Sequence, residues 1–205
     1  NLDHGLHFES VVRALRLGFS SVMFDGSTLE YEENIRQTRE VVKMCHAVGV
    51  SVEAELGAVG GDEGGALYGH ADESLFTDPM LARDFVDRTG IDALAVAIGN
   101  AHGKYKGEPL LDFPRLDAIR QQAAIPLVLH GGSGISDDDF KRAIELGIHK
   151  INFYTGMSQA ALSAVETRMA NRQPLYDEFA ELLLGIEEAI TDTVSEQMRI
   201  FGSAG

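Results

Sequence analysis

The chain has 205 residues, of which 44% are hydrophobic and 24% charged, a globular composition that excludes disordered, collagen-like and coiled-coil chains. Its 32 acidic and 17 basic residues give a formal net charge of −15, which repels phosphate backbones and anionic lipid. We therefore expect neither nucleic acid nor a membrane as partner. The single cysteine, Cys45, cannot form an internal disulfide, which favours a buried thiol and a cytoplasmic location.

Short apolar runs rich in Val, Ile and Ala alternate with segments of helical periodicity, a pattern that predicts a parallel α/β sheet. The first residues look like the end of a strand. Five further strands are predicted at 21–25, 50–55, 93–98, 126–130 and 150–153. Predicted helices stop at Gly18, Gly49 and Gly147, and the last of them opens at Ser136 with Asp139 as a capping-box partner. Two more helices, at about 157–170 and 175–200, form a tail within 157–205.

Polar residues close the predicted strands, where parallel α/β folds build their active sites. In chain order they are Asp3, His4, Asp25, Glu55, His102, His130, Asn152 and Thr155. Three of them are histidines next to glycine, and three imidazoles can hold Zn²⁺ while leaving one position open for substrate. The other four histidines lie on helix patterns, in a loop or before a strand, and we do not expect them to be ligands.

Asp25 and Glu55 close the two strands that lie between the first and second histidine ligands. They could bind the metal directly, orient the histidine ligands through hydrogen bonds, or hold another cation. We favour the orientation of the histidines. Asp25 could also cap the next helix, because Gly26 and Ser27 follow it.

The segment from His130 to Gly134 contains Gly131, Gly132 and Ser133 between a strand and a helix, an arrangement that directs backbone N–H groups at an anion. Asn152 and Thr155, at the end of the next strand, can add donors to the same anion. In (β/α)₈ barrels a phosphate site is often built from the loops after strands 7 and 8. The sequence therefore predicts a phosphorylated substrate bound beside a metal.

Five motifs in this order resemble the class II, zinc-dependent ketose-bisphosphate aldolases, which cleave fructose or tagatose 1,6-bisphosphate. They are Leu2-Asp3-His4-Gly5, Val52 to Gly61, Ala101 to Pro109, Leu127 to Gly134, and Lys150-Ile151-Asn152 with Thr155. The resemblance covers essentially the whole chain. It implies reversible cleavage to dihydroxyacetone phosphate and glyceraldehyde 3-phosphate on a TIM (β/α)₈ barrel, in a cytoplasmic homodimer or homotetramer.

Carried over to this sequence, the resemblance implies roles for individual residues. Asp3 and Glu63, the latter in the long loop from Gly57 to about Asp78, are the proton-transferring carboxylates. The metal residues are His4, His102 and His130, with Asp25 and Glu55 near a buried or secondary position. The dihydroxyacetone phosphate site, with a monovalent cation (Na⁺ or K⁺), comprises Gly103, Gly131, Gly132, Ser133, Asn152 and Thr155.

Breaking the C3–C4 bond of a ketose leaves negative charge that must spread onto the C2 carbonyl oxygen, where Zn²⁺ acts as a Lewis acid. One carboxylate must move the C4 hydroxyl proton and another must protonate the carbanion. A Schiff-base aldolase is disfavoured, because Lys150 is expected to open its strand far from the catalytic end. A zinc hydrolase or an inactive phosphosugar-binding subunit remain the alternatives.

Counting strands back from the phosphate loop makes His130 the end of strand 7 and Asp3 the tip of strand 3. We therefore expect residues 1–205 to be a single aldolase domain that forms an N-terminally incomplete barrel. Such barrels typically need about 250 residues. Expressed alone, this chain is expected to aggregate or stay partly folded.

Overall fold

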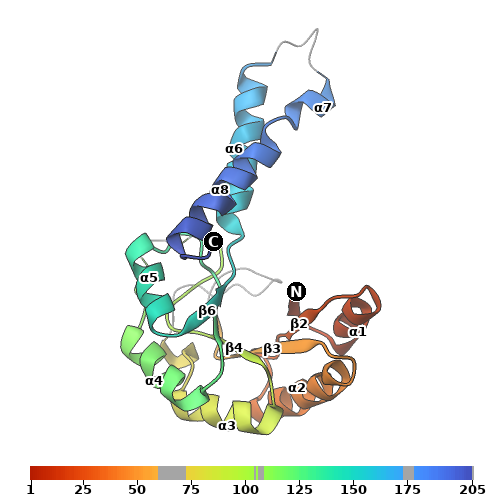
Figure 1. Ribbon diagram of the computed structural model, residues 1–205, viewed down its shortest axis with the longest axis vertical. Coiled ribbons are helices and arrows are strands. Elements are labelled where there is room, and N and C mark those ends of the chain that lie inside the picture. The colour runs from red at the N-terminus through yellow and green to blue at the C-terminus, as the bar shows by residue number, and fades with distance from the viewer. Residues whose placement is uncertain (60–72, 104, 106–108, 173–177, 205) are drawn as a thin grey trace.

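The computed structural model describes residues 1–59, 73–103, 105, 109–172 and 178–204. Six parallel strands form one curved sheet whose spatial order follows the chain order (Figure 1). The strands are β1 (Leu2–Gly5), β2 (Ser21–Phe24), β3 (Ser51–Leu56), β4 (Ala93–Val96), β5 (Leu127–Leu129) and β6 (Ile148–Ile151). This open sheet confirms the predicted incomplete (β/α)₈ barrel.

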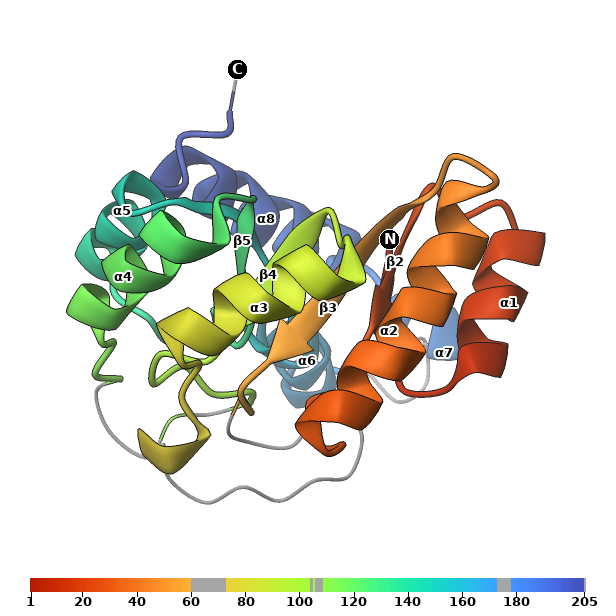
Figure 2. The same cartoon turned by 90° about the horizontal axis from the view of Figure 1, so that it is seen from below.

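Five helices cover the outer face of the sheet, side by side in Figure 2. They are α1 (Phe8–Arg16), α2 (Tyr31–His46), α3 (Pro79–Thr89), α4 (Phe113–Ala123) and α5 (Asp137–Glu145). The main core lies between these helices and the strands and includes Val11, Phe24, Phe85, Leu116 and Phe140, all nearly or fully buried. Cys45 is buried in the same core, as expected.

Two of these helices, α3 and α4, were not singled out from the sequence, although each carries a start signal. The Asp78 carboxylate accepts hydrogen bonds from the backbone N–H groups of Met80 and Leu81, and α3 ends at Gly90 with a φ of +72°. Asp112 caps α4 in the same way, and each helix has a proline in its first turn. The Ser136 hydroxyl accepts from the N–H of Asp139, as the capping box predicts.

The last strand is displaced from its predicted position, because β6 spans Ile148–Ile151 and not residues 150–153. Its register with β5 pairs Val128 with Lys150 and Leu129 with Ile151. Lys150 is therefore next to the carboxyl end of the strand, and the expectation that it opens the strand far from the catalytic end was wrong.

The chain continues into three helices, α6 (Thr155–Ala170), α7 (Phe179–Leu182) and α8 (Ile186–Ile200). In Figure 1, α6 and α8 run side by side away from the sheet, and α7 lies near the far end of this arm. The single helix predicted at 175–200 is thus divided into α7 and α8. None of the helices in the described residues is both long and apolar enough to cross a membrane.

Candidate active site

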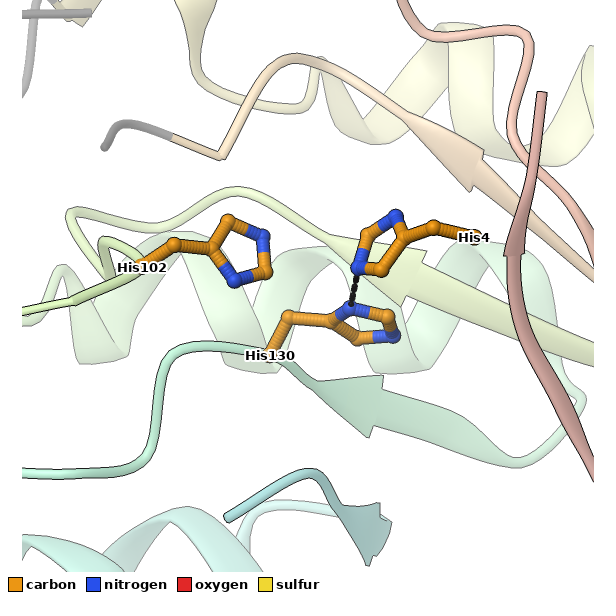
Figure 3. Close-up of side chains that lie close together, drawn as sticks. All are labelled: His4, His102 and His130. Carbon is orange, nitrogen blue, oxygen red and sulfur yellow. Dashed lines mark hydrogen bonds between the residues drawn. The ribbon is translucent and has the colours of Figure 1, made fainter. Parts of the chain in front are cut away.

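Three histidine side chains converge at the carboxyl edge of the sheet (Figure 3). His4 lies in β1, His102 in the segment after β4, and His130 directly after β5. One nitrogen of each ring lies within 4.8 Å of the others, and the Nδ1 atom of His130 is 2.9 Å from the Nε2 atom of His4. His130 is fully buried and His102 nearly so. The parallel topology thus brings together the three histidines that the sequence singled out.

Two of the imidazole rings contact a carboxylate with one nitrogen, and these contacts determine which of the remaining ring nitrogens face each other. Asp25 Oδ2 lies 2.8 Å from Nδ1 of His4, and Glu53 Oε1 lies 2.9 Å from Nε2 of His130. An ionised carboxylate only accepts hydrogen bonds, so each of these ring nitrogens carries the proton. The lone pairs of His4 Nε2 and His130 Nδ1 then face each other, which is favourable only with a cation near them.

The two carboxylates are themselves held in the ionised form. Burial alone would raise the pKa of Asp25, but hydrogen bonds from His4 and Ser27 outweigh it and lower the pKa. Burial would also raise the pKa of Glu53, but its contacts with His130 and with the Lys150 ammonium outweigh burial and lower the pKa. Burial lowers the pKa of His130, which keeps its ring neutral and able to bind a metal. Asp25 Oδ1 also accepts from the N–H of Ser27, but Asp25 does not cap the next helix, because Glu30 is the N-cap of α2 and no side chain caps that helix.

Glu55 provides a second possible metal position. Its carboxylate lies within 4.8 Å of His4 and Asp25, and its Oε2 atom is buried without a hydrogen-bond partner among the described residues. Burial, with the nearby charge of Asp25, raises the pKa of Glu55 to about 8. A buried carboxylate oxygen with no donor is suited to a bound cation. The two groups of possible ligands at this edge of the sheet, the three histidines and His4 with Asp25 and Glu55, therefore fit a metal such as zinc.

Asp3 lies beside the histidines and is linked to the last strand. Its Oδ1 atom is 3.8 Å from Nε2 of His4 and accepts a hydrogen bond of 2.8 Å from the side-chain amide of Asn152. Asn152 Oδ1 accepts in turn from the Lys150 ammonium, at 2.7 Å. About half of the Asp3 side chain is exposed. A partly exposed carboxylate next to a metal position can exchange a proton with a bound ligand.

A cavity of about 340 Å³ opens next to Asp3. All six residues predicted to bind the substrate line it, together with residues from the start of α6. The lining residues are Asp3, Gly103, Gly131, Gly132, Ser133, Ile151, Asn152, Phe153, Tyr154, Thr155 and Met157. Ser133 Oγ accepts a hydrogen bond of 2.9 Å from the N–H of Gly156, so its hydroxyl hydrogen can be donated to a ligand. The N-terminus of α6 adds backbone N–H groups, which favour an anion such as phosphate.

Tyr105 ties the loop of His102 to the loop that follows His130. Its hydroxyl accepts from the N–H of Ala101 and donates to the carbonyl of Gly131, each at 2.9 Å. The two loops touch so closely that a side chain on Gly131, whose φ is +67°, would collide with the backbone of Ala101. Burial raises the pKa of Tyr105 to about 12, which keeps its hydroxyl protonated as a donor.

Among the predicted site residues, Glu63 lies outside the described residues, so its role stays a prediction. Sequence reasoning missed Glu53, Lys150 and Tyr105. A signal for Glu53 was available, because it precedes Glu55 by two residues in the same strand and so shares its face. His46 and His149, which were not expected to be ligands, lie outside the three-histidine cluster.

Comparisons with known proteins agree with this geometry. Residues 1–205 match the family described as "Fructose-bisphosphate aldolase class-II". A fructose-bisphosphate aldolase from Geobacillus stearothermophilus is 46% identical over 205 residues, which are 100% of this chain and 70% of that protein. One from Staphylococcus aureus is 44% identical over 204 residues, with the same coverage. The crystal structure of the YdjI aldolase from Escherichia coli superimposes with a TM-score of 0.84 at 42% identity, over 99% of this chain and 69% of that one.

Proposed function

The chain belongs to the class II fructose-bisphosphate aldolase family, and on this premise we propose that it cleaves a ketose 1,6-bisphosphate, with zinc held by His4, His102 and His130. The products are dihydroxyacetone phosphate and glyceraldehyde 3-phosphate, and the reaction is reversible. The observation that carries the proposal is the juxtaposition of the three histidines with a cavity bordered by Asp3, Ser133 and the N-terminus of α6. The first supports a metal, and the second a phosphorylated substrate beside it.

Zinc bound to the three imidazoles would supply a Lewis acid for the negative charge that develops on the C2 carbonyl oxygen of the ketose. Asp25 orients the imidazole of His4, and Glu53 that of His130, by accepting a hydrogen bond from the protonated ring nitrogen. Asp25 and Glu55, which with His4 form the second group of possible ligands, could hold the metal at a buried position.

The proton transfers fall to carboxylates of this chain. Asp3 takes the proton of the C4 hydroxyl in cleavage and returns it in condensation, since it lies at the edge of the cavity beside His4. Glu63 is proposed as the group that protonates the carbanion. The Asn152 amide donates to Asp3 and so steadies the carboxylate that moves the proton.

The phosphate group of the substrate is held mainly by neutral donors. Ser133 and Thr155 offer hydroxyl groups, and Gly103, Gly131 and Gly132 allow close approach of the backbone. Such a site tolerates the acidic net charge of the chain, because local dipoles dominate at short range. From the family resemblance alone we add a monovalent cation, Na⁺ or K⁺, at this position. On the same ground we propose one domain over 1–205, a cytoplasmic location, and a homodimer or homotetramer.

The proposal is tested by a coupled assay of the natural protein on fructose 1,6-bisphosphate and tagatose 1,6-bisphosphate, before and after treatment with a chelator. Cleavage of one sugar that is lost with the metal and restored by Zn²⁺ supports it. Zinc binding with no cleavage of either sugar would favour the inactive phosphosugar-binding subunit or a zinc hydrolase. Borohydride trapping of a lysine adduct would favour a Schiff-base aldolase, although the Lys150 ammonium is paired with Glu53 and is thus a poor nucleophile.

A further inference from the structure

We propose that Lys150 is a positioning residue of this site, which fixes the imidazole of His130 and the amide of Asn152 with a single ammonium group. Its Nζ atom lies 2.8 Å from Glu53 Oε2 and 2.7 Å from Asn152 Oδ1. The inference rests on the proposed function, since it assigns a role in that same metal and proton-transfer site.

The first contact acts on the metal side of the site. Glu53 uses Oε1 to hold His130 and Oε2 to accept from Lys150, and only 5% of its side chain is exposed. A carboxylate buried this deeply needs a partner for each of its oxygens. Lys150 pairs with Oε2, and this contact fixes the orientation in which Oε1 faces Nε2 of His130. His130 thus keeps its proton on Nε2 and presents the lone pair of Nδ1 to the other histidine.

The second contact acts on the side of the substrate. The two ends of an asparagine amide have the same shape, and the neighbours decide which end is the donor. A lysine ammonium can only donate, so it holds Oδ1 of Asn152. The NH₂ group must then face Asp3, whose carboxylate can only accept and lies 2.8 Å away. The same NH₂ group is 3.3 Å from Nε2 of His130, a longer contact than the one that this nitrogen makes with Glu53.

The position of Lys150 in the sheet explains why one side chain serves both purposes. Lys150 is in β6 and Glu53 is in β3, and two strands separate them in the sheet order. Their ion pair therefore crosses the concave interior of the half-barrel, where no backbone ladder joins the two strands. The contact fixes the phosphate-binding end of the chain relative to the histidines, a relationship that the sheet hydrogen bonds alone leave indirect.

The test compares the Lys150→Met variant with a control variant, Lys141→Met, whose substitution lies on the exposed surface of α5. The natural protein, without any substitution, is the reference for both. The zinc dissociation constant is measured by competition with a chromophoric chelator, and kcat and KM by the coupled aldolase assay. We expect Lys150→Met to weaken zinc binding about tenfold, at the lower end of the effect of removing a partner of a metal ligand. We expect kcat to fall about 10-fold to 100-fold with a smaller change in KM, because Asn152 and Asp3 lose their alignment. Lys141→Met should change neither quantity.

A charge-neutral double variant, Glu53→Gln with Lys150→Met, separates the two contacts and removes the uncompensated charge that could impair folding of the single variant. The amide oxygen of the introduced glutamine can still accept from His130, so zinc affinity should return toward that of the natural protein, whereas kcat should stay low because Asn152 is still not held. Zinc affinity and kcat of Lys150→Met equal to those of Lys141→Met would overturn the inference. A natural protein that binds zinc but cleaves neither sugar would contradict the proposed function instead. The zinc titration alone would then decide the inference.

Discussion

The Nδ1 atom of His130 lies 2.9 Å from the Nε2 atom of His4, and each ring uses its other nitrogen to contact a carboxylate, that of Glu53 or of Asp25. Neutral imidazoles with protons on the carboxylate side have no hydrogen to share between these two atoms. The arrangement is therefore stable only with a proton or a metal ion nearby. The nearness of His102, whose ring centroid is 5.0 Å from that of His4, favours the metal.

Metal removal should therefore destabilise the fold as well as abolish activity. A ligand that binds only the folded state at 100 times its dissociation constant stabilises it by about 2.7 kcal/mol. We expect the melting temperature to fall after chelation and to recover when Zn²⁺ is added, which differential scanning calorimetry can measure. His102→Ala should lose this response to zinc. His149→Ala, a control at an exposed histidine, should keep it. An unchanged melting temperature in the natural protein would argue against a zinc site here.

Asp3→Asn should reduce turnover without removing the metal. Asparagine keeps the shape of aspartate but cannot take a proton, and proton transfer by a positioned side chain contributes about 10²–10⁴-fold. We expect kcat to fall by this factor, with KM and zinc content close to those of the natural protein. Asp138→Asn, at a 96% exposed side chain on α5, is the matched control. Loss of zinc with unchanged turnover per bound metal would instead mean that Asp3 supports the metal ligands.

The sequence predicted that the three histidines and the glycine-rich loop after His130 lie close together, because the relevant signal is local. His102, His130 and the glycine-rich loop follow apolar runs, and His4 lies where the sequence looks like the end of a strand. Parallel strands bring such positions to one edge. Lys150 and Glu53 were missed because both lie within strands, where only the register decides which side chains meet across the interior. The displacement of β6 relative to its predicted position also hid Lys150. Tyr105 was missed because its hydroxyl joins two loops, and no pattern in the sequence reports such a contact.

Ser133→Ala should raise KM for the phosphorylated substrate more than it lowers kcat, because contacts to a phosphate away from the reacting bonds stabilise ground and transition states alike. The loss of one hydrogen bond to a charged group corresponds to about 1.5–3 kcal/mol, or roughly 10-fold to 150-fold in KM. The control is Ser136→Ala, which removes the cap of α5 without touching the cavity. For Asn152→Ala we expect kcat to fall as well, since this amide also holds Asp3. An unchanged KM in both Ser133→Ala and Asn152→Ala would contradict the proposal that this cavity binds the phosphate group of the substrate.

Tyr105→Phe should lower stability and weaken zinc binding together. The change leaves the N–H of Ala101 and the carbonyl of Gly131 without their shared partner, and a buried polar group left unpaired costs about 1–3 kcal/mol. His102 and His130 adjoin these two residues, so their spacing should loosen. Chemical denaturation and the chelator competition assay measure the two effects. Tyr31→Phe, which loses contacts with Leu81 and Asp84 on the outer helices, should leave zinc binding unchanged.

The two outer strands of the sheet determine how residues 1–205 behave when expressed alone. β1 pairs only with β2 and β6 only with β5 among the described residues, so each has an edge whose backbone groups can pair with another chain. We expect this polypeptide to self-associate, bind a hydrophobic dye and bind zinc weakly, because β1 carries His4 and its placement depends on one neighbour. A chain extended by about 80 N-terminal residues, roughly the length of two to three strand–helix units of such a barrel, should suppress these properties. Light scattering and zinc titration of both chains test this expectation. A monodisperse, tightly zinc-binding 205-residue chain would contradict it and would mean that β1 and β6 are stable as edges.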